Sequence, residues 1–417
     1  MGLDSNLPCL FGFFSEASNR FQPPPVEGAK LLFGLGETCG IYQVGVLEDV
    51  HFFKAEKAAV LFWGRLYDPP SLPALLESLA VGSAETARRL LEGVQGSFVL
   101  FQFRQEEEGP ALFLSTDKYG FRRLLYCEVE GGIYFATHLQ GFRFLFEAKP
   151  PRLSESALLH YYNFGFTPND QTLLDGLKKV PPGAVLTRAR GRSHIEPYFS
   201  LADLYRPEEY VGRGEREICE TLDARLLASV KRRRPVQGTA GVALSGGVDS
   251  GYMAQKLVQA GAELIAYTLA YGGFYDEFGR VDRLAQVLGI QVRKITASPG
   301  EIIENFEAAS GVTSEPTRFN NASLHLLAQA AQKDGVRFQF DGGWRGPAFP
   351  GHVPVLAVPE TRPGLWPSQS ARPGAAGPGA HGFGAAPRDA EGGHPLQKLD
   401  SRPCSVYRAE PRRRAYL

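Results

Sequence analysis

The strongest constraint on the fold of this chain is a strand that runs into a glycine loop and then into a helix. Residues 241–244 (GVAL) are apolar, residues 245–250 read SGGVDS, and a helical pattern begins near Gly251. Two adjacent glycines let a backbone come close to an anion, and N–H groups converge at the start of a helix, where the dipole favours negative charge. The stretch therefore predicts a phosphate-binding loop made by Ser245, Gly246, Gly247, Val248 and Ser250.

Asp249 is the unusual member of this loop, because a carboxylate beside a triphosphate would repel it. We expect Asp249 either to act through a bound Mg²⁺ or to fix the loop by accepting backbone N–H donors.

From about Val211 to Asp341, helical and strand-like segments alternate along the chain. The helical segments are REICETLDARLLASVKRRR, SGYMAQKLVQAGA, FGRVDRLAQVLG and ASLHLLAQAAQKDG, and the strands are GVALS, ELIAYTLAY, QVRKITA and VRFQFD. Such alternation predicts a parallel sheet with helices on both faces.

Before about Tyr198 the pattern is that of short strands separated by Gly, Asp and Pro turns. The strands are VGVLEDVHFF, AAVLFWGRLY, SFVLFQF, ALFLST, RLLYCEVE and GIYFAT. One helix-like segment, from SLPALLESLA to ETARRLLEGV, interrupts them. This half is expected to be an α+β domain with substantial antiparallel sheet.

Composition narrows the class of protein. The formal net charge of the 417 residues is zero, which argues against a general binder of nucleic acids or anionic membranes. Five widely spaced cysteines (Cys9, Cys39, Cys127, Cys219 and Cys404) form no CxxC, which disfavours a disulfide framework or a zinc site. The N-terminus has no basic segment before an apolar run, and no stretch reaches about 18 apolar residues. We expect a cytoplasmic protein without membrane or nucleic-acid partners. A homodimer is compatible with these observations.

Residues 245–250 resemble the pyrophosphatase loop of ATP-dependent amidating and adenylating enzymes, which cleave ATP between the α- and β-phosphates. In the first half, Asp117-Lys-Tyr-Gly-Phe-Arg-Arg-Leu-Leu-Tyr126 resembles the D-x-x-G-x-x-P-L-Y segment of the glutaminase-type domain in asparagine synthetases. Further segments in the family's order are Gly96-Ser-Phe98, Phe135-Ala-Thr137, Thr172 to Gly176, Val180 to Gly183 and Tyr198-Phe199. Over about residues 90 to 342 the chain is similar to the asparagine synthetase-like family.

This resemblance implies an Ntn-hydrolase-like α+β sandwich over residues 1–200 and an incomplete α/β, adenine nucleotide α-hydrolase-like synthetase domain over residues 211–342. It also implies ATP and Mg²⁺ as cofactors, with Leu244 packed on the adenosine, Leu269 ending the strand that reads the adenine, and Asp341 and Gly342 contacting ATP. Tyr275-Asp-Glu277 resembles the family's S-D-E, although an acid pair that simply starts a helix explains it equally well.

The chain departs from the glutamine-hydrolysing members at its N-terminus. Those members use a cysteine that is residue one of the mature chain, whereas this sequence begins Met1-Gly-Leu3. Cys39, although followed by Gly-Ile, is expected to be a small buried hydrophobe. The first domain is therefore expected to keep its fold without glutaminase activity.

Loss of the glutaminase is also found in the β-lactam synthetases and the lasso-peptide cyclases, where a substrate amine attacks an adenylated carboxylate. The reaction expected here joins a small-molecule or peptide carboxylate to ammonia or an amine. Asparagine biosynthesis, an inactive remnant and a tRNA-modifying enzyme with the same loop stay open as alternatives. For Lys231 to Arg234, the two interpretations are a solvated helix end and a tRNA-contacting patch.

The pattern stops after Asp341, where the family requires S-G-E-G-A-D-E-L-F. Back-translation of Gly343 to Phe349 shows that removal of one nucleotide restores Asp-Gly-x-Gly-Ala-Asp-x-Leu-Phe. Residues 343–417 are rich in Pro and Gly and are expected to be either disordered or read out of frame.

Overall fold

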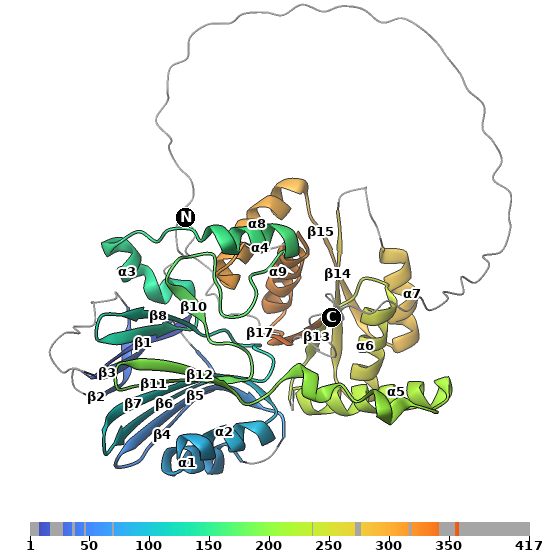
Figure 1. Ribbon diagram of the computed structural model, residues 1–417. Coiled ribbons are helices and arrows are strands. Elements are labelled where there is room, and N and C mark those ends of the chain that lie inside the picture. The colour runs from blue at the N-terminus through green and yellow to red at the C-terminus, as the bar shows by residue number, and fades with distance from the viewer. Residues whose placement is uncertain are drawn as a thin grey trace, which may run out of the picture. The chain divides into compact units, whose positions relative to one another are not determined.

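The computed structural model describes residues 8–16, 28–35, 38–45, 47–68, 71–235, 237–271, 277–316, 319–341 and 355–357 (Figure 1). Tyr275, Asp276, Gly342 and most of the expected tail lie outside these ranges, so the hypotheses about them stay predictions.

The first half contains two six-stranded antiparallel sheets. One sheet has the order β10-β8-β9-β1-β3-β2, with the bounds Leu177–Lys179, Leu125–Val129, Gly132–Ala136, Cys9–Ser15, Cys39–Val44 and Lys30–Leu35. The other has the order β12-β11-β7-β6-β5-β4, with the bounds Arg192–Pro197, Ala184–Ala189, Gly109–Thr116, Gly96–Glu106, Ala58–Leu66 and Val50–Lys54. The expected antiparallel sheet is confirmed.

The two sheets pack face to face, and helices cover their outer faces (Figure 1). The core between the sheets is made largely of aromatic and aliphatic side chains such as Phe14, Phe101 and Phe135. Helices α1 (Leu72–Val81) and α2 (Ala84–Gly93) pack on the outer face of the sheet that contains β6. The turn η1 (Leu139–Phe142) and α3 (Arg143–Ala148) cover the other sheet. This order of layers buries the central strands of each sheet, whereas the edge strands β2, β4 and β12 stay largely exposed.

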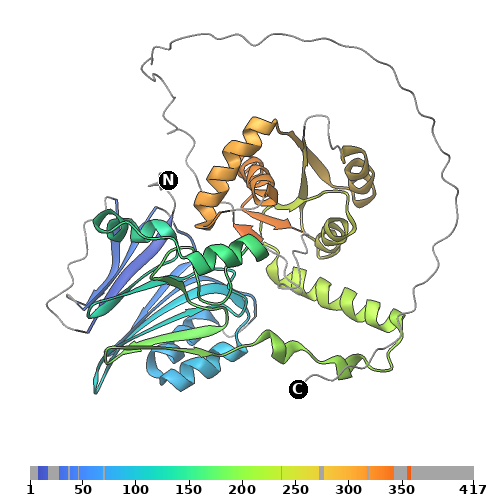
Figure 2. The ribbon, with the colours of Figure 1, turned by 45° about the horizontal axis from the view of Figure 1, so that its top comes forward.

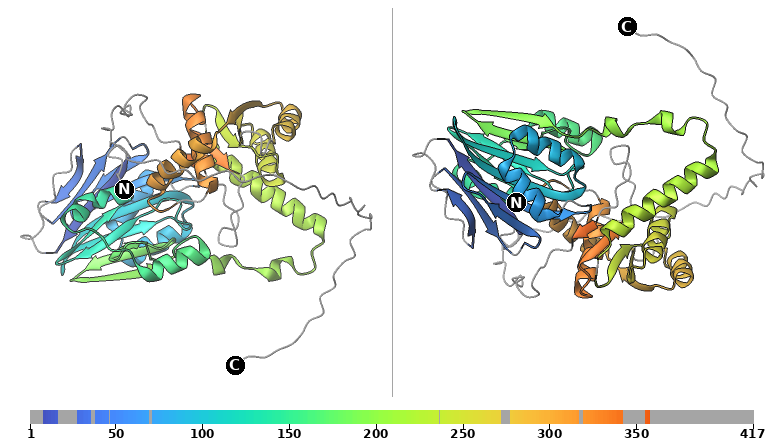
Figure 3. Two further views of the ribbon diagram at one scale, coloured as in Figure 1. Left: turned by 90° about the horizontal axis from the view of Figure 1, so that it is seen from above. Right: turned by 90° about the horizontal axis from the view of Figure 1, so that it is seen from below.

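The second half is an α/β unit, reached through the turns η2 (Leu201–Leu204) and η3 (Pro207–Tyr210) and the long helix α5 (Glu215–Arg233) (Figure 3). Its sheet has the order β15-β14-β13-β16-β17, with the bounds Gln291–Thr296, Leu264–Ala270, Ala240–Ala243, Phe338–Asp341 and Val355–Ala357. The first four strands pair in parallel, and β17 pairs antiparallel to β16.

Helices cover both faces of this sheet, as the alternating sequence predicts. Helices α5, α6 (Val248–Gln259) and α7 (Phe278–Leu288) pack on the face that contains Val242 and Phe340. Helix α9 (Phe319–Lys333) packs on the face that contains Tyr267, and α8 (Pro299–Thr313) lies beside α9 (Figure 2). The carboxyl ends of the parallel strands therefore meet at one edge, where α6 and α7 begin.

Several expectations from the sequence need correction. VGVLEDVHFF is not one strand, because β3 ends at Val44 and β4 starts at Val50, with Asp49 between them at φ 58°. The sequence pattern also does not predict the helices α4 (Glu155–Phe164) and α8. The start of α8 carries a recognisable signal, since Ser298 and Glu301 form a capping box and Pro299 is its first residue. The strand β17 lies within the segment expected to lack structure.

Candidate functional site

The loop from Ser245 to Ser250 joins β13 to α6 at the carboxyl edge of the parallel sheet, as the sequence predicts. Gly246 has φ +71°, a left-handed conformation that favours glycine. Gly247 precedes α6 and supplies no side-chain cap, so the first N–H groups of that helix are open to a ligand. Ser245, Gly247, Val248 and Asp249 are exposed, and Val248 has 87% of its surface accessible.

Hydrogen bonds between its two serines close the loop on itself. The buried Ser250 hydroxyl accepts the N–H of Ser245 at 3.2 Å and donates to the Gly247 carbonyl at 3.2 Å. The two hydroxyl oxygens are also 3.2 Å apart. Ser250 is thus a structural residue of the loop, while the exposed Ser245 hydroxyl can turn towards a ligand.

Asp249 lies in the first turn of α6 and makes no side-chain hydrogen bond or ion pair within the described residues. The idea that it fixes the loop by accepting backbone donors is therefore not supported by these contacts. Its role through Mg²⁺ stays a prediction. The part of the chain that the structure describes contains no group of three or more acidic, His or Cys side chains arranged for a metal ion.

The two predicted adenosine contacts lie on opposite faces of the sheet. Leu244 is 2% exposed and belongs to the core shared with α5, α6 and α7. Leu269 is partly buried in the core under α9. Leu244 is therefore a core residue, and of the two only Leu269 keeps exposed surface near the end of its strand.

Asp341 ends β16 and pairs in register with Ala243 of β13, directly before the loop. The predicted proximity of Asp341 to the phosphate loop therefore follows from the strand pairing. Two residues earlier, Gln339 is fully buried, and both polar atoms of its amide lack a hydrogen-bond partner within the described residues.

The sandwich motifs that resemble the glutaminase-type domain meet around one buried carboxylate. The side chain of Asp117 accepts backbone N–H groups from Phe98, Tyr119, Phe121 and Arg122 at 3.0–3.2 Å. Burial raises the pKa of Asp117, and these four hydrogen bonds act in the opposite direction. The D-x-x-G segment thus serves here to hold a turn.

The segments Val180 to Gly183 and Tyr198-Phe199 pack against the same turn. Gly120 has φ +64°, and a β-carbon there would lie 2.9 Å from the Pro182 ring. The Gly183 N–H donates to the Asp117 carbonyl at 3.0 Å, and the Tyr198 hydroxyl donates to the Thr116 carbonyl at 2.6 Å. The segments around Phe98, Asp117, Gly183 and Tyr198 therefore form one structural unit.

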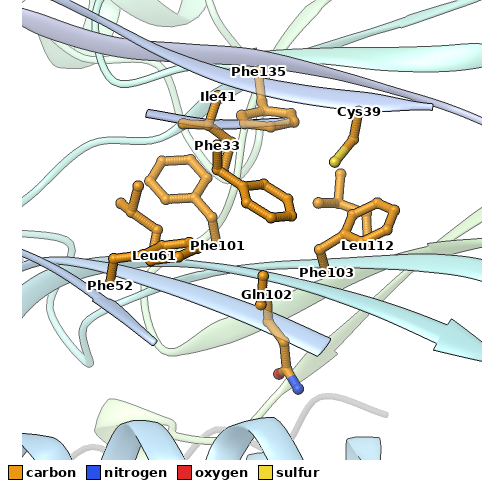
Figure 4. Close-up of a pocket in the computed structure, with 11 residues that line it drawn as sticks. Phe33, Cys39, Ile41, Phe52, Leu61, Phe101, Gln102, Phe103, Leu112 and Phe135 are labelled. Atoms are coloured by element: carbon orange, nitrogen blue, oxygen red, sulfur yellow. The ribbon is translucent and has the colours of Figure 1, made fainter. Parts of the chain in front are cut away.

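The cysteines nearest the N-terminus are not placed to act as nucleophiles. Cys9 and Cys39 are buried in neighbouring strands, and burial raises the pKa of each thiol to about 12. Cys39 faces a small cavity between the two sheets that is lined by apolar side chains (Figure 4). The amide of Gln102 points away from this cavity and donates to the Leu79 carbonyl at 2.7 Å. The lining of the cavity is thus largely apolar, and the absence of glutaminase activity stays a prediction.

The basic run at the end of α5 contacts the sandwich. Arg232 pairs with Asp68 at 3.2 Å, and the Arg233 guanidinium lies 4.5 Å from the centre of the Tyr67 ring. Arg232 stays exposed, as expected for a solvated helix end, whereas Arg233 is half-buried and departs from that expectation. Because Arg232 and Arg233 make these contacts, fewer basic side chains of the run are available to bind a nucleic acid.

A second set of contacts joins the sandwich to the turn between α8 and α9. Arg123, which stands where the family has proline, donates to the Thr313 carbonyl and pairs with Glu315 at 3.5 Å. Lys179 lies 3.6 Å from the other oxygen of Glu315, and His138 Nε2 is 2.6 Å from the Gly311 carbonyl oxygen. Because α9 runs back to β16, which is parallel to β13, this turn lies at the carboxyl edge of the sheet.

No helix within the described ranges combines the length and the apolar character needed to cross a membrane.

Two family models match the chain. The model described as asparagine synthase matches residues 221–343, and the model described as glutamine amidotransferase domain matches residues 76–199. The first match contains the Ser245–Ser250 loop, and the second contains the turn around Asp117.

Three curated relatives are similar to more than half of this chain. "Amidase chry2" of Gibberella zeae is 26% identical over 293 residues, covering 65% of this chain and 42% of the relative. "Amidase chyE" of Penicillium rubens is 25% identical over 299 residues, covering 64% of this chain and 43% of the relative. "Asparagine synthetase [glutamine-hydrolyzing] 1" of Bacillus subtilis is 25% identical over 246 residues, covering 58% of this chain and 37% of the relative. The chain thus spans less than half the length of these relatives.

Solved structures with detectable similarity include an allosteric regulatory enzyme of purine biosynthesis, at 10% identity and a TM-score of 0.29 over 70% of this chain and 75% of that one. The glutamine phosphoribosylpyrophosphate amidotransferase of B. subtilis has the same identity and TM-score. The similarity covers 69% of this chain and 84% of that one. Similarity at this level is too low to establish a shared fold.

Proposed function

Because this chain belongs to the asparagine synthetase-like family, we propose that its Ser245–Ser250 loop binds the phosphates of ATP in an amide-forming ligase reaction. In this reaction ATP adenylates a carboxylate and releases pyrophosphate, and ammonia or an amine then attacks the acyl-adenylate. The observation that carries the proposal is the loop itself, with its left-handed Gly246 and the uncapped start of α6 at the carboxyl edge of a parallel sheet.

The loop residues can supply electrostatic stabilisation to the leaving pyrophosphate. Backbone N–H groups fixed at the start of α6 are oriented before the reaction begins, so they need not reorganise as negative charge develops. Asp249 would hold the Mg²⁺ that accompanies ATP, because a hard cation prefers carboxylate oxygen and its charge offsets that of the phosphates.

The sandwich is proposed to be a scaffold without glutaminase activity. Cys9 and Cys39 are buried with raised thiol pKa values, and the apolar cavity beside Cys39 offers no polar contact. The amine would then come from ammonia or from the second substrate. Aspartate is one candidate carboxylate, and a peptide or other small acid, as in the β-lactam synthetases and lasso-peptide cyclases, is another. Two relatives are named amidases, which agrees with chemistry at an amide bond.

A second candidate is a remnant that binds nucleotide without completing the reaction. It is favoured by the asparagine synthase match, which ends at residue 343, where the family pattern is lost. In the family pattern the acids that hold Mg²⁺-pyrophosphate follow Gly342, and this chain has Gly343-Trp-Arg345 there instead. An extra nucleotide in this codon region is our explanation for the lost pattern.

ATP–pyrophosphate exchange separates these two candidates. The full chain is assayed with a panel of carboxylates that includes aspartate, next to a version from which the extra nucleotide has been removed. Carboxylate-dependent exchange by the full chain supports the ligase. Exchange by the repaired version alone supports the remnant, and exchange by neither version contradicts the proposed adenylation.

A further inference from the structure

We propose that Arg280 is a phosphate-binding residue of this site, which contacts the β- and γ-phosphates of ATP and then the released pyrophosphate. The inference rests on the proposed function of the Ser245–Ser250 loop, and it adds a residue from a neighbouring helix that the loop sequence does not reveal.

Arg280 lies against the loop. A β-carbon built on Gly246 would be 2.9 Å from Cβ of Arg280 and 3.6 Å from its Cδ. The aliphatic stem of the arginine thus covers the one loop residue that has a left-handed backbone. Since α7 follows β14 and α6 follows β13, and these strands are parallel neighbours, both helices start at the same edge of the sheet.

The guanidinium is available for a ligand. Arg280 is exposed, and within the described residues its side chain makes no hydrogen bond or ion pair. The carboxylate of Asp249, in the first turn of α6, likewise has no ion-pair partner there. The loop and the start of α7 therefore carry one cation and one anion that are not paired with other described residues, which suits a site that holds a polyphosphate with Mg²⁺.

The position of Arg280 in its helix is unfavourable in the absence of an anion. Arg280 is the third residue of α7, whose first turn contains no acid, although Glu277 precedes the helix as its N-cap. The N-terminal end of a helix carries partial positive charge, so a cation there is repelled by the dipole. A bound phosphate would interact favourably with the arginine and with the starts of both α6 and α7 at once.

The guanidinium fork also fits the chemistry of the leaving group. It can donate two parallel N–H bonds to a phosphate, and it stays charged throughout the reaction. Arg280 packs on Gly246, and the loop that contains Gly246 is the one proposed to hold the leaving pyrophosphate, so these bonds would serve the phosphates beyond the α position.

Calorimetric titration of the full chain with ATP, AMP and pyrophosphate tests the inference on Arg280→Gln. Removal of a charge-assisted hydrogen bond to the distal phosphates should raise the dissociation constants for ATP and pyrophosphate about tenfold and leave that for AMP nearly unchanged. Arg283→Gln is the matched control, because Arg283 is an exposed arginine of the same helix, one turn further along, without an ion pair to another described residue. It should leave all three constants within about twofold of the wild-type values.

Equal ATP affinity for wild type and Arg280→Gln would overturn the role of Arg280 while leaving the proposed loop intact. An equal loss of affinity for ATP and AMP would also overturn it, because a merely structural role would affect both ligands. If the wild-type chain binds none of the three ligands, the proposed function itself fails.

Discussion

Gln339 is a buried amide within the parallel sheet. Both polar atoms of its side chain lack hydrogen-bond partners within the described residues, and the residue is fully buried. Leaving a polar group in this state costs about 1–3 kcal/mol. We expect Gln339→Leu to raise the free energy of unfolding by about 1 kcal/mol or more, measured by urea denaturation.

Gln102→Leu is the matched control for that substitution. Gln102 is similarly buried and its Oε1 also lacks a partner within the described residues, but its Nε2 donates to the Leu79 carbonyl, so its replacement breaks a hydrogen bond and should lower the free energy of unfolding. Destabilisation of similar size by both substitutions would show that Gln339 has a partner after all.

The reactivity of the cysteines follows their burial. Burial raises the pKa of Cys9 and Cys39 to about 12, whereas Cys219 is exposed on α5. Iodoacetamide at pH 8 should therefore label Cys219 in the folded protein and label Cys9 and Cys39 only after unfolding. Peptide mass spectrometry reads the sites. Labelling of Cys39 as fast as Cys219 would reopen a nucleophilic role for it.

Among the structural elements, the turn between β7 and β8 depends on one carboxylate. Asp117→Ala would leave four backbone N–H groups without their acceptor, so we expect it to lower the free energy of unfolding by about 3 kcal/mol. Asp117→Asn keeps one acceptor oxygen and should have an intermediate effect. Both values come from urea denaturation, and equal stability of wild type and Asp117→Ala would show that the turn holds without the carboxylate.

Some elements can be predicted from the sequence, and others cannot, for physical reasons. The βα alternation after Val211 is local and regular, so it predicts the order of β13, α6, β14, α7 and β15 correctly. It does not reveal α8, although a capping box is present, because the apolar residues of this helix are few and Ile303 and Phe306 stay exposed. The contact between Arg280 and Gly246 joins residues of two different βα units, so only the fold brings it to light.

At the scale of the whole molecule, the sandwich contacts α8 through His138, whose hydrogen bonds fit a neutral ring. His138 Nδ1 accepts the Gln140 N–H at 3.2 Å, so its proton lies on Nε2 and is donated to the Gly311 carbonyl. Burial lowers the pKa of His138, and the positive charge of Arg123 acts in the same direction. A second proton on Nδ1 would break the hydrogen bond from Gln140.

This arrangement makes the contact sensitive to acid. An unfolded histidine has a pKa of about 6.5, so below that pH the unfolded state binds the proton more readily than the folded one. The stabilisation from His138 is therefore complete above about pH 6.5 and decreases as the pH falls towards the lowered folded pKa. Thermal unfolding of wild type and His138→Gln should differ more at pH 7.5 than at pH 5.5. His194→Gln, at an exposed position, is the control, and a pH-independent difference for His138 would contradict this assignment.

The central claim is that Ser245 to Ser250 form a phosphate-binding loop, and equilibrium binding of ATP to the full chain tests it most directly. Gly246→Ala forces a side chain into a left-handed position against Arg280, whereas Gly261→Ala makes the same change at φ +77° with no atom within 4 Å. We expect wild type and Gly261→Ala to bind ATP with similar affinity and Gly246→Ala to lose at least about tenfold. Absence of ATP binding by wild type, or equal binding by both variants, would contradict the claim.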